Sequence, residues 1–311
     1  MQLGSLNQVF TEAVIAGLKD VSSPSDALIA RINILTASDP DSSDEGTRRW
    51  NRYLCARNTA WDHYIGVTRA AGLLDADIEA RLRSPDDSNF RSAMAECMTC
   101  RLLAHELGLH VFGRHEGRPG TALDFGIARA DGNISVEVKS PYAEKPSGSI
   151  WGDDHSHILE RALDDANKRQ FAEGRRNVLA LVPQVDFPVL AGRSPYIKAF
   201  FGEQKLVFTI DRKTGRSISE PEAKFIADGK FLRLWPLTPR FTRLGAVLAI
   251  REALIESGDG EDFQAQMELR WFVLHNPNCP NPIPEDLWGA CPQLVVDDDV
   301  MRWTDDRPIV E

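Results

Sequence analysis

Two acidic residues and a lysine in the segment from Thr121 to Lys139 are the strongest candidates for chemistry. Asp124 lies in the first of two predicted strands, and Glu137 and Lys139 lie two residues apart in the second. Because side chains alternate along a strand, Glu137 and Lys139 point to the same face of the sheet. A hairpin brings Asp124 close to Glu137, so two carboxylates and one ammonium group are predicted to converge at one edge.

This combination suits a divalent metal ion. Two neighbouring carboxylates are costly unless a cation neutralises them, and hard carboxylate oxygens with open coordination prefer Mg²⁺ or Mn²⁺. We predict that Asp124, Glu137 and the main-chain carbonyl of Val138 bind the metal. Lys139 is predicted to orient an attacking water or to stabilise the charge on a phosphate. Metal-assisted hydrolysis of a phosphodiester uses these components.

Turn and alternation patterns predict the hairpin that carries these residues. Asp131-Gly132 separates two runs of alternating apolar residues, 122–128 and 134–140, and an Asp-Gly pair in that position is a strong hairpin signal. Val136 and Val138 are predicted to point into a core, on the face opposite Glu137.

The order of the other elements predicts an α/β or α+β fold, in which helices flank a mixed central sheet and follow a helical N-terminal region. The predicted helices are residues 7–18, 25–36, 47–72, 75–82, 89–107, 156–173 and 244–257. The predicted strands are residues 110–113, 122–128, 134–140, 177–182, 206–211, 231–235 and 267–275. We divide the chain into a helical region (1–88), a core (89–258), and a C-terminal strand with a Pro-rich acidic extension packing on that core (259–311).

The hairpin and its surroundings resemble the PD-(D/E)xK nuclease superfamily, which has the restriction-endonuclease-like fold. Asp124, a gap of 12 residues and then Glu137-Val138-Lys139 match the motif, although Leu123 stands where the motif has proline. The resemblance extends over roughly residues 90 to 185, because a helix precedes the hairpin and a helix and buried strand follow it.

The resemblance implies further site residues and a function. Glu96, on the preceding helix, would complete the acidic ring or bind a second metal, and Gln170, on the following helix, would assist positioning. The implied activity is that of a Mg²⁺- or Mn²⁺-dependent nuclease acting on nucleic acid, with DNA preferred over RNA. The alternative is a nuclease-like fold without catalysis that serves as a binding or scaffold protein. In that case Glu137 and Lys139 form only an exposed ion pair, which contributes little energy.

The charge of the chain bears on the expected substrate. The sequence has 36 Lys and Arg against 46 Asp and Glu, a net charge of −10, whereas phosphate binding favours a basic face. Basic residues nevertheless concentrate in the middle and acidic residues at the ends. We predict a basic face near the site that holds a phosphate backbone; scattered solubilising charge is the alternative. We also expect a homodimer or a protein partner that supplies part of the contacts with the nucleic acid. The basic residues are Lys168, Arg169, Arg175, Arg176, Arg193, Lys198, Lys205, Arg212, Lys213, Arg216, Arg233, Arg240 and Arg243.

Other motifs exclude several classes of protein. No segment approaches the roughly 20 apolar residues of a membrane helix, no export signal is visible, and the five cysteines are odd in number. A cytoplasmic protein with reduced thiols is therefore expected. Cys97 and Cys100 lie on an amphipathic helix and are predicted to be core thiols. His105 and His110 are five residues apart, and so do not form the zinc-protease pair on one helical face.

Overall fold

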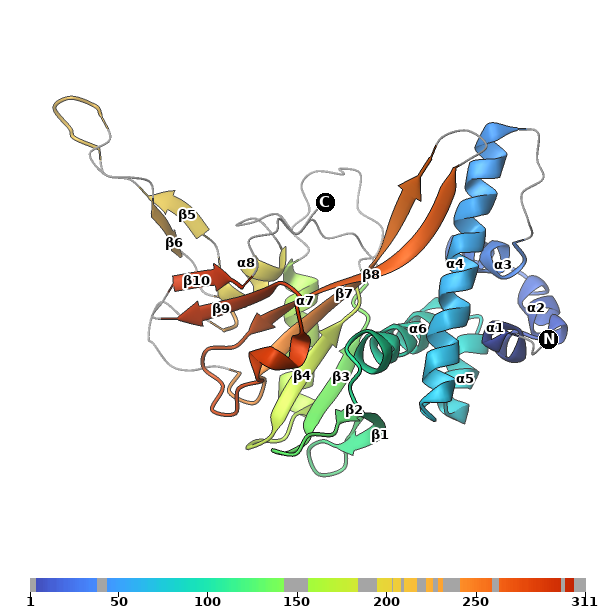
Figure 1. Ribbon diagram of the computed structural model, residues 1–311, viewed down its shortest axis with the longest axis horizontal. Helices are drawn as coiled ribbons and strands as arrows, with labels where there is room; N and C mark the ends of the chain where they lie inside the picture. Colours follow the sequence, from blue (N-terminus) through green and yellow to red (C-terminus); the bar gives the residue numbers. More distant parts are fainter. Residues whose placement is uncertain are drawn as a thin grey trace.

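The computed structural model describes residues 4–37, 44–142, 156–183, 195–202, 204–207, 210–216, 222–225, 229–231, 241–258, 263–297 and 300–304. In these ranges the protein has a mixed α/β architecture, in which helices lie on both faces of an eight-stranded mixed sheet (Figure 1). The predicted fold class is thereby confirmed at the level of a mixed sheet flanked by helices. Within the described ranges, no helix combines the length and the apolar character needed to cross a membrane.

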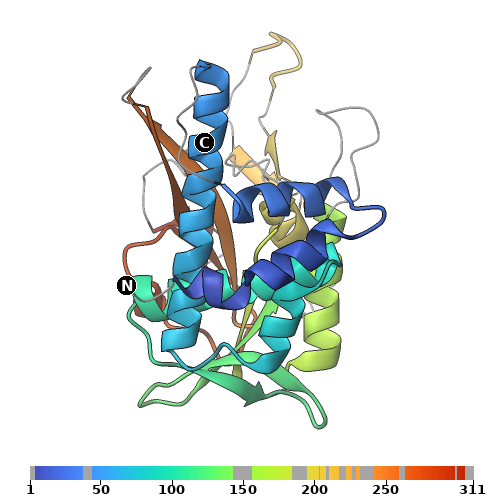
Figure 2. The same cartoon turned by 90° about the vertical axis from the view of Figure 1, so that its right-hand side faces the viewer.

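Helices come first along the chain and lie in front of the sheet in Figure 2. Most begin at a side chain that accepts a main-chain N–H of the first turn, as Ser25, Asp75 and Asp86 do for α3, α5 and α6. The helix α6 continues into a π-helical turn, Leu102–Glu106, and Gly108 follows at a positive φ of 62°. The bounds are α1 Ser5–Val9, α2 Glu12–Lys19, α3 Asp26–Leu35, α4 Glu45–Ala70, α5 Ala76–Arg83 and α6 Asp87–Arg101.

The sheet has the strand order β1-β2-β3-β4-β7-β8-β9-β10. The β3–β4, β4–β7 and β8–β9 pairs are parallel and the other pairs are antiparallel. The strands are β1 Val111–Glu116, β2 Ala122–Ile127, β3 Ile134–Lys139, β4 Arg176–Leu181, β7 Ala246–Ser257, β8 Gln264–His275, β9 Gln293–Asp297 and β10 Val300–Trp303. A separate pair comprises β5 Gln204–Val207 and β6 Glu222–Phe225. The remaining helical segments are α7 Ser156–Asp165, a π-helical turn Ala166–Gln170, α8 Pro195–Phe201 and a 3₁₀ helix Glu285–Trp288.

Two hydrophobic cores cover the two faces of the sheet. Val136 and Val138 of β3 belong to the core that also contains residues of α1 to α6. Leu179 and Leu181 of β4 belong to the other core, which includes α7 and α8. The predicted direction of Val136 and Val138 is therefore confirmed, and Glu137 between them lies on the α7 side.

The helix predicted over residues 244–257 is wrong, because Ala246–Ser257 forms strand β7. Ala, Leu, Glu and Arg in this segment favour a helix locally. In the folded chain, Ala246 to Ala249 instead pair with β4, and the whole of β7 pairs with β8. Burial between two strands therefore overrides local propensity here.

The second half of the β7–β8 pair extends beyond the sheet and lies beside α4 (Figure 1). Its Glu252 carboxylate is 2.9 Å from the Arg57 guanidinium of α4.

The C-terminal extension contains more regular structure than predicted, since β9 and β10 complete the sheet edge. Of the predicted strand 231–235, Phe231 is not in a strand, and 232–235 lie outside the described residues. The proposed boundary at residue 88 falls in the first turn of α6, and that at residue 258 falls directly after β7. Because β8 pairs with β7 along its full length, the predicted C-terminal division (259–311) shares one sheet with the predicted core (89–258).

Replacing Gly126 by alanine is expected to destabilise the protein. Gly126 pairs directly with Phe112 across β1 and β2, and an added Cβ would lie 2.2 Å from the Phe112 ring. We expect Gly126→Ala to lower the free energy of unfolding by about 1–3 kcal/mol in urea titrations. The loss should shrink in a Phe112→Leu background, where the ring is gone. Gly17→Ala is the control, since nothing lies within 4 Å of its added Cβ; an equal loss there would contradict the explanation.

Candidate metal centre

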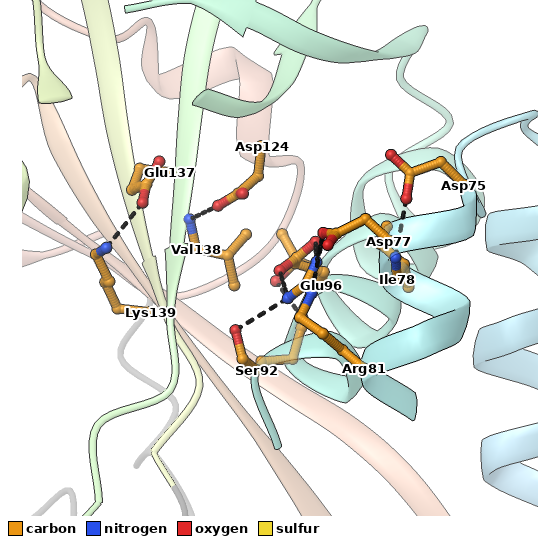
Figure 3. A network of polar contacts seen from close by, with 12 residues as sticks. Asp75, Asp77, Ile78, Arg81, Ser92, Glu96, Asp124, Glu137, Val138 and Lys139 are labelled. Atoms are coloured by element: carbon orange, nitrogen blue, oxygen red, sulfur yellow. Dashed lines mark hydrogen bonds and ion pairs between the residues drawn. The ribbon is translucent and has the colours of Figure 1, made fainter. Parts of the chain in front are cut away.

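The site forms where β2 separates from β3. Their ladder ends at the pair Phe125 and Val136, so Asp124 has no ladder partner in β3. Arg114, on the opposite strand β1, has a positive φ of 38°, and the backbone is distorted there. The Asp124 side chain instead accepts the Val138 N–H, with an Oδ2 to N distance of 2.7 Å (Figure 3). A carboxylate thus occupies the gap between the two strands.

The main-chain carbonyl of Val138 points into the same gap. The carbonyl of the next residue, Lys139, accepts the Val182 N–H at 2.9 Å and so faces β4. Successive residues of a strand direct their main-chain groups to alternate sides, so Val138 faces β2, in agreement with its bond to Asp124. Beyond the end of the β2–β3 ladder, the described residues include no main-chain partner for this carbonyl. Among the described residues it is therefore available to a ligand, and its predicted role as a metal ligand stays a prediction.

Glu137, Lys139 and Gln170 meet on the α7 face of β3. The Lys139 ammonium is 2.9 Å from Glu137 Oε1 and 3.6 Å from Asp165 Oδ2 of α7. The Gln170 side-chain amide donates a hydrogen bond to the same Glu137 oxygen. Glu137 is only 3% exposed, and its Oε2 is buried without a hydrogen-bond partner among the described residues. An unpartnered buried carboxylate oxygen is costly, so this atom is the clearest candidate for contact with a cation.

Glu96 lies on the other face, in α6, and is held by Arg81 of α5. The two groups form a bidentate ion pair with N to O distances of 2.7 and 3.0 Å, and Arg81 also contacts Asp77 (Figure 3). Glu96, Arg81 and Asp124 line one cavity of about 210 Å³. Glu96 thus faces the site as predicted, but its direct partner is a guanidinium group.

The carboxylates raise one another's pKa. Burial is the largest cause for Asp124, and the charge of Glu137 raises its pKa further, against the opposing Val138 N–H. Burial also raises the pKa of Glu96, and Arg81 only partly offsets it. The pKa of Glu137 is raised by burial and lowered by Lys139, with a net increase. Burial would lower the pKa of Lys139, but Glu137 and Asp165 raise it overall. Lys139 therefore remains protonated. Its positive charge does not fully compensate the neighbouring carboxylates, whose pKa values stay raised.

These residues fit a divalent cation in part. Two carboxylates and a free main-chain carbonyl are the oxygen ligands that Mg²⁺ accepts while keeping several waters. The orphaned Glu137 Oε2 supports a cation at this position. In the part of the chain that the structure describes, no group of three or more His, Cys, Asp or Glu side chains is arranged to hold a metal. Because Glu96 is paired with Arg81, Asp124 and Glu137 are the two predicted carboxylates that could contact a cation.

Sequence reasoning missed two residues of this site. Arg81 is 15 residues from Glu96 and on a different helix, so no local spacing connects them. Asp165 belongs to α7, and its pairing with Lys139 depends on how α7 packs over β3. The i,i+4 spacing of Asp77 and Arg81 does indicate a charged helix face, but not the face that meets Glu96.

The predicted basic face is divided between two ends of the sheet. Lys168 and Arg169 directly precede Gln170, and their side chains are 70% and 80% exposed. Arg175 and Arg176 lie at the opposite end of β4, where Arg176 is level with Ile134 of β3. Arg193, Arg233 and Arg240 lie outside the described residues, as does the side chain of Lys205.

The thiols of Cys97 and Cys100 are buried, as predicted. His105 lies in the π-helical turn and His110 beyond its end, so the two do not share a helix face.

The comparisons with known proteins return no match: no family model fits the chain, and no curated protein or solved structure is similar to it at a significant level.

Proposed function

We propose that the protein is a Mg²⁺- or Mn²⁺-dependent nuclease with a restriction-endonuclease-like core. The proposal rests on one observation: at the end of the β2–β3 ladder Asp124 accepts the Val138 N–H, and Glu137 and Lys139, the two neighbours of Val138, form an ion pair on the α7 face of β3. Buried carboxylates with raised pKa values in a strand gap are typical of functional sites.

Each residue has a definite part in this proposal. Asp124, Glu137 and the Val138 carbonyl would hold the cation, which supplies Lewis acidity and a more acidic bound water. Lys139 stays protonated between Glu137 and Asp165 and can stabilise negative charge on a phosphate. Gln170 fixes the orientation of Glu137 through its amide.

DNA is the proposed substrate, and the phosphate backbone is the part of it that the site would contact. Lys168 and Arg169 stand exposed on the turn that carries Gln170, and their charges are only partly matched by Asp164 and Asp165. Such residues position a backbone without reading bases.

Lys139→Ala is expected to abolish plasmid degradation in Mg²⁺, because it removes the positive group next to the carboxylates. Loss of one such stabilising group costs about 10²–10³-fold in rate. The matched control is Lys19→Ala, an exposed lysine in the last turn of α2 that does not belong to the predicted basic face. Activity is read on agarose gels, with metal chelation as the blank. Equal degradation by the wild type, Lys139→Ala and Asp124→Ala would exclude these residues as the active site.

A non-catalytic scaffold is the second candidate function, because basic side chains of the protein itself partly neutralise the carboxylates of the site. Arg81 compensates Glu96, and Lys139 compensates Glu137, without a metal. Titration with Mn²⁺ and Mg²⁺ while recording the melting temperature separates the two functions. An intact site is stabilised by mass action, by about 2.7 kcal/mol at 100 times the dissociation constant. No shift together with no cleavage would favour the scaffold.

Metal affinity is expected to rise with pH from 6 to 8. The carboxylates must be deprotonated to bind a cation, and the pKa of Asp124 is raised by burial and by Glu137. Protons therefore compete with the metal within this range. For each proton released on binding, the metal affinity should change by at most about tenfold per pH unit. Calorimetric Mn²⁺ titrations at pH 6, 7 and 8 measure the effect. Identical affinities at all three values would show that no protonated carboxylate lies at the metal site.

A further inference from the structure

A cavity of about 880 Å³ lies along the part of β8 that precedes its pairing with β9. Leu269 to Phe272 of β8 form one wall, and Leu287 to Pro292 form another. Arg129, which also lines it, is five residues beyond Asp124, about 16 Å along an extended chain. The cavity shares no lining residue with the one that contains Glu96 and Asp124. Small-molecule sites typically measure about 300–1,000 Å³.

Before its pairing with β9 begins, β8 has main-chain groups that lack a ladder partner among the described residues. Pairing with β9 begins only at Val273, whose N–H donates to the Pro292 carbonyl at 3.0 Å. Because main-chain groups alternate along an antiparallel strand, those of Leu269 and Trp271 point to the same outer side. Among the described residues they have no ladder partner there. The surrounding walls are largely apolar, with Leu107, Leu287 and Trp288 among the lining side chains.

Two arginines on the wall lie directly opposite each other. Arg251 of β7 pairs in register with Arg270 of β8, and both line the cavity. Like charges at such positions disfavour the pairing. Each of the two has at least one other contact, so an anion between them would be an additional partner. Of the acidic residues that line the cavity, Glu106 is already paired with Arg101 at 2.7 Å.

We propose that this cavity binds a small amphipathic anion. An aromatic body would lie against the leucine and tryptophan side chains. Arg251 and Arg270 lie on the opposite face of the β7–β8 pair, so a carboxylate or sulfonate at the end of the ligand would pass the edge of β8 to bind between them. The N–H groups of Leu269 and Trp271, which have no ladder partner among the described residues, would donate hydrogen bonds to polar atoms of the same ligand. This site is separate from the proposed nuclease centre and does not depend on it.

Two dyes that differ in one group test the proposal on the full chain. The anionic probe is 8-anilinonaphthalene-1-sulfonate, and its neutral counterpart is N-phenyl-1-naphthylamine, which lacks the sulfonate. We expect saturable, one-to-one binding of the anionic dye in fluorescence titrations. The double variant Arg251→Gln/Arg270→Gln should lower the affinity for the anionic dye by about tenfold or more. Its affinity for the neutral dye should be unchanged.

Two further variants complete the test. Arg212→Gln/Arg216→Gln removes the same charge from an exposed turn and should leave both dyes unchanged. Ala290→Trp adds bulk at an exposed lining position and should weaken both dyes. Circular dichroism confirms that each variant is folded. The proposal is overturned if anionic-dye binding is not saturable, if it survives both cavity variants, or if the control weakens it equally.

Discussion

Asp124→Asn is expected to abolish Mg²⁺-dependent DNA cleavage and, at the same time, to raise the melting temperature of the metal-free protein. Asparagine keeps an oxygen that can accept the Val138 N–H. It removes a negative charge that is disfavoured by burial and by Glu137. A site built to hold a cation is strained without it, and relieving such strain commonly stabilises a protein. We expect an increase of about 2–6 °C.

The pH dependence of this gain follows from the raised pKa of Asp124. A carboxyl group with a raised pKa binds its proton more tightly in the folded state, so stability falls as pH rises from the unfolded pKa through the folded pKa. The gain from Asp124→Asn should therefore be largest at pH 8 and should disappear near pH 4, where Asp124 is protonated in the folded protein.

The matched control for Asp124 is Asp131→Asn, in the hairpin turn. Arg129 and Arg176 lower the pKa of Asp131, so its charge is favourable in the folded state. That variant should be neutral or slightly less stable at pH 8 and should retain cleavage. Calorimetric melting in the presence of chelator and plasmid degradation in Mg²⁺ are the two measurements. A lower metal-free melting temperature for Asp124→Asn, or retained cleavage, would contradict the prediction.

Arg81→Met is expected to destabilise the protein more than the replacement of any other partly exposed residue near the site. It leaves the Glu96 carboxylate, which is 8% exposed, without its bidentate partner. Removing one member of a buried pair costs about 3–5 kcal/mol, and we expect about 2–3 kcal/mol here because Arg81 is itself 22% exposed. Adding Glu96→Gln should recover much of the loss, since no buried charge then remains.

Urea unfolding at pH 8 and pH 5 measures the size and the origin of this loss. Burial raises the pKa of Glu96, and Arg81 opposes that increase. With a pKa of about 7, Glu96 is already protonated at pH 5 with Arg81 in place, and the pKa rises further without Arg81. No buried charge is then left at pH 5, so the cost of the substitution decreases there. The control is Arg114→Met, whose partner Asp75 and own side chain are 43% and 65% exposed, and which should cost less than about 1 kcal/mol. Equal losses for both arginines would show that Arg81 does not compensate a buried charge.

Much of the site was predictable because it is local in sequence. The Asp131-Gly132 turn and the alternating runs specify the β2–β3 hairpin, and the hairpin brings Asp124 beside β3, where it accepts the Val138 N–H. The same alternation places Glu137 and Lys139 on one face, and Val136 and Val138 in the core. The functional roles assigned to these residues stay predictions.

Tertiary structure decided what depends on distant partners. Residues 246–257 favour a helix locally and become a strand only because β4 and β8 accept their main-chain hydrogen bonds. Glu96 is on the predicted helix, but its pairing with Arg81 requires α5 to pack on α6. Likewise, Asp165 meets Lys139 only when α7 covers β3. By itself the sequence determined the hairpin and the order of its acidic and basic groups, through turn chemistry and side-chain alternation. Only packing decided which charges are compensated, because burial and ion pairing arise between segments that periodicity does not connect.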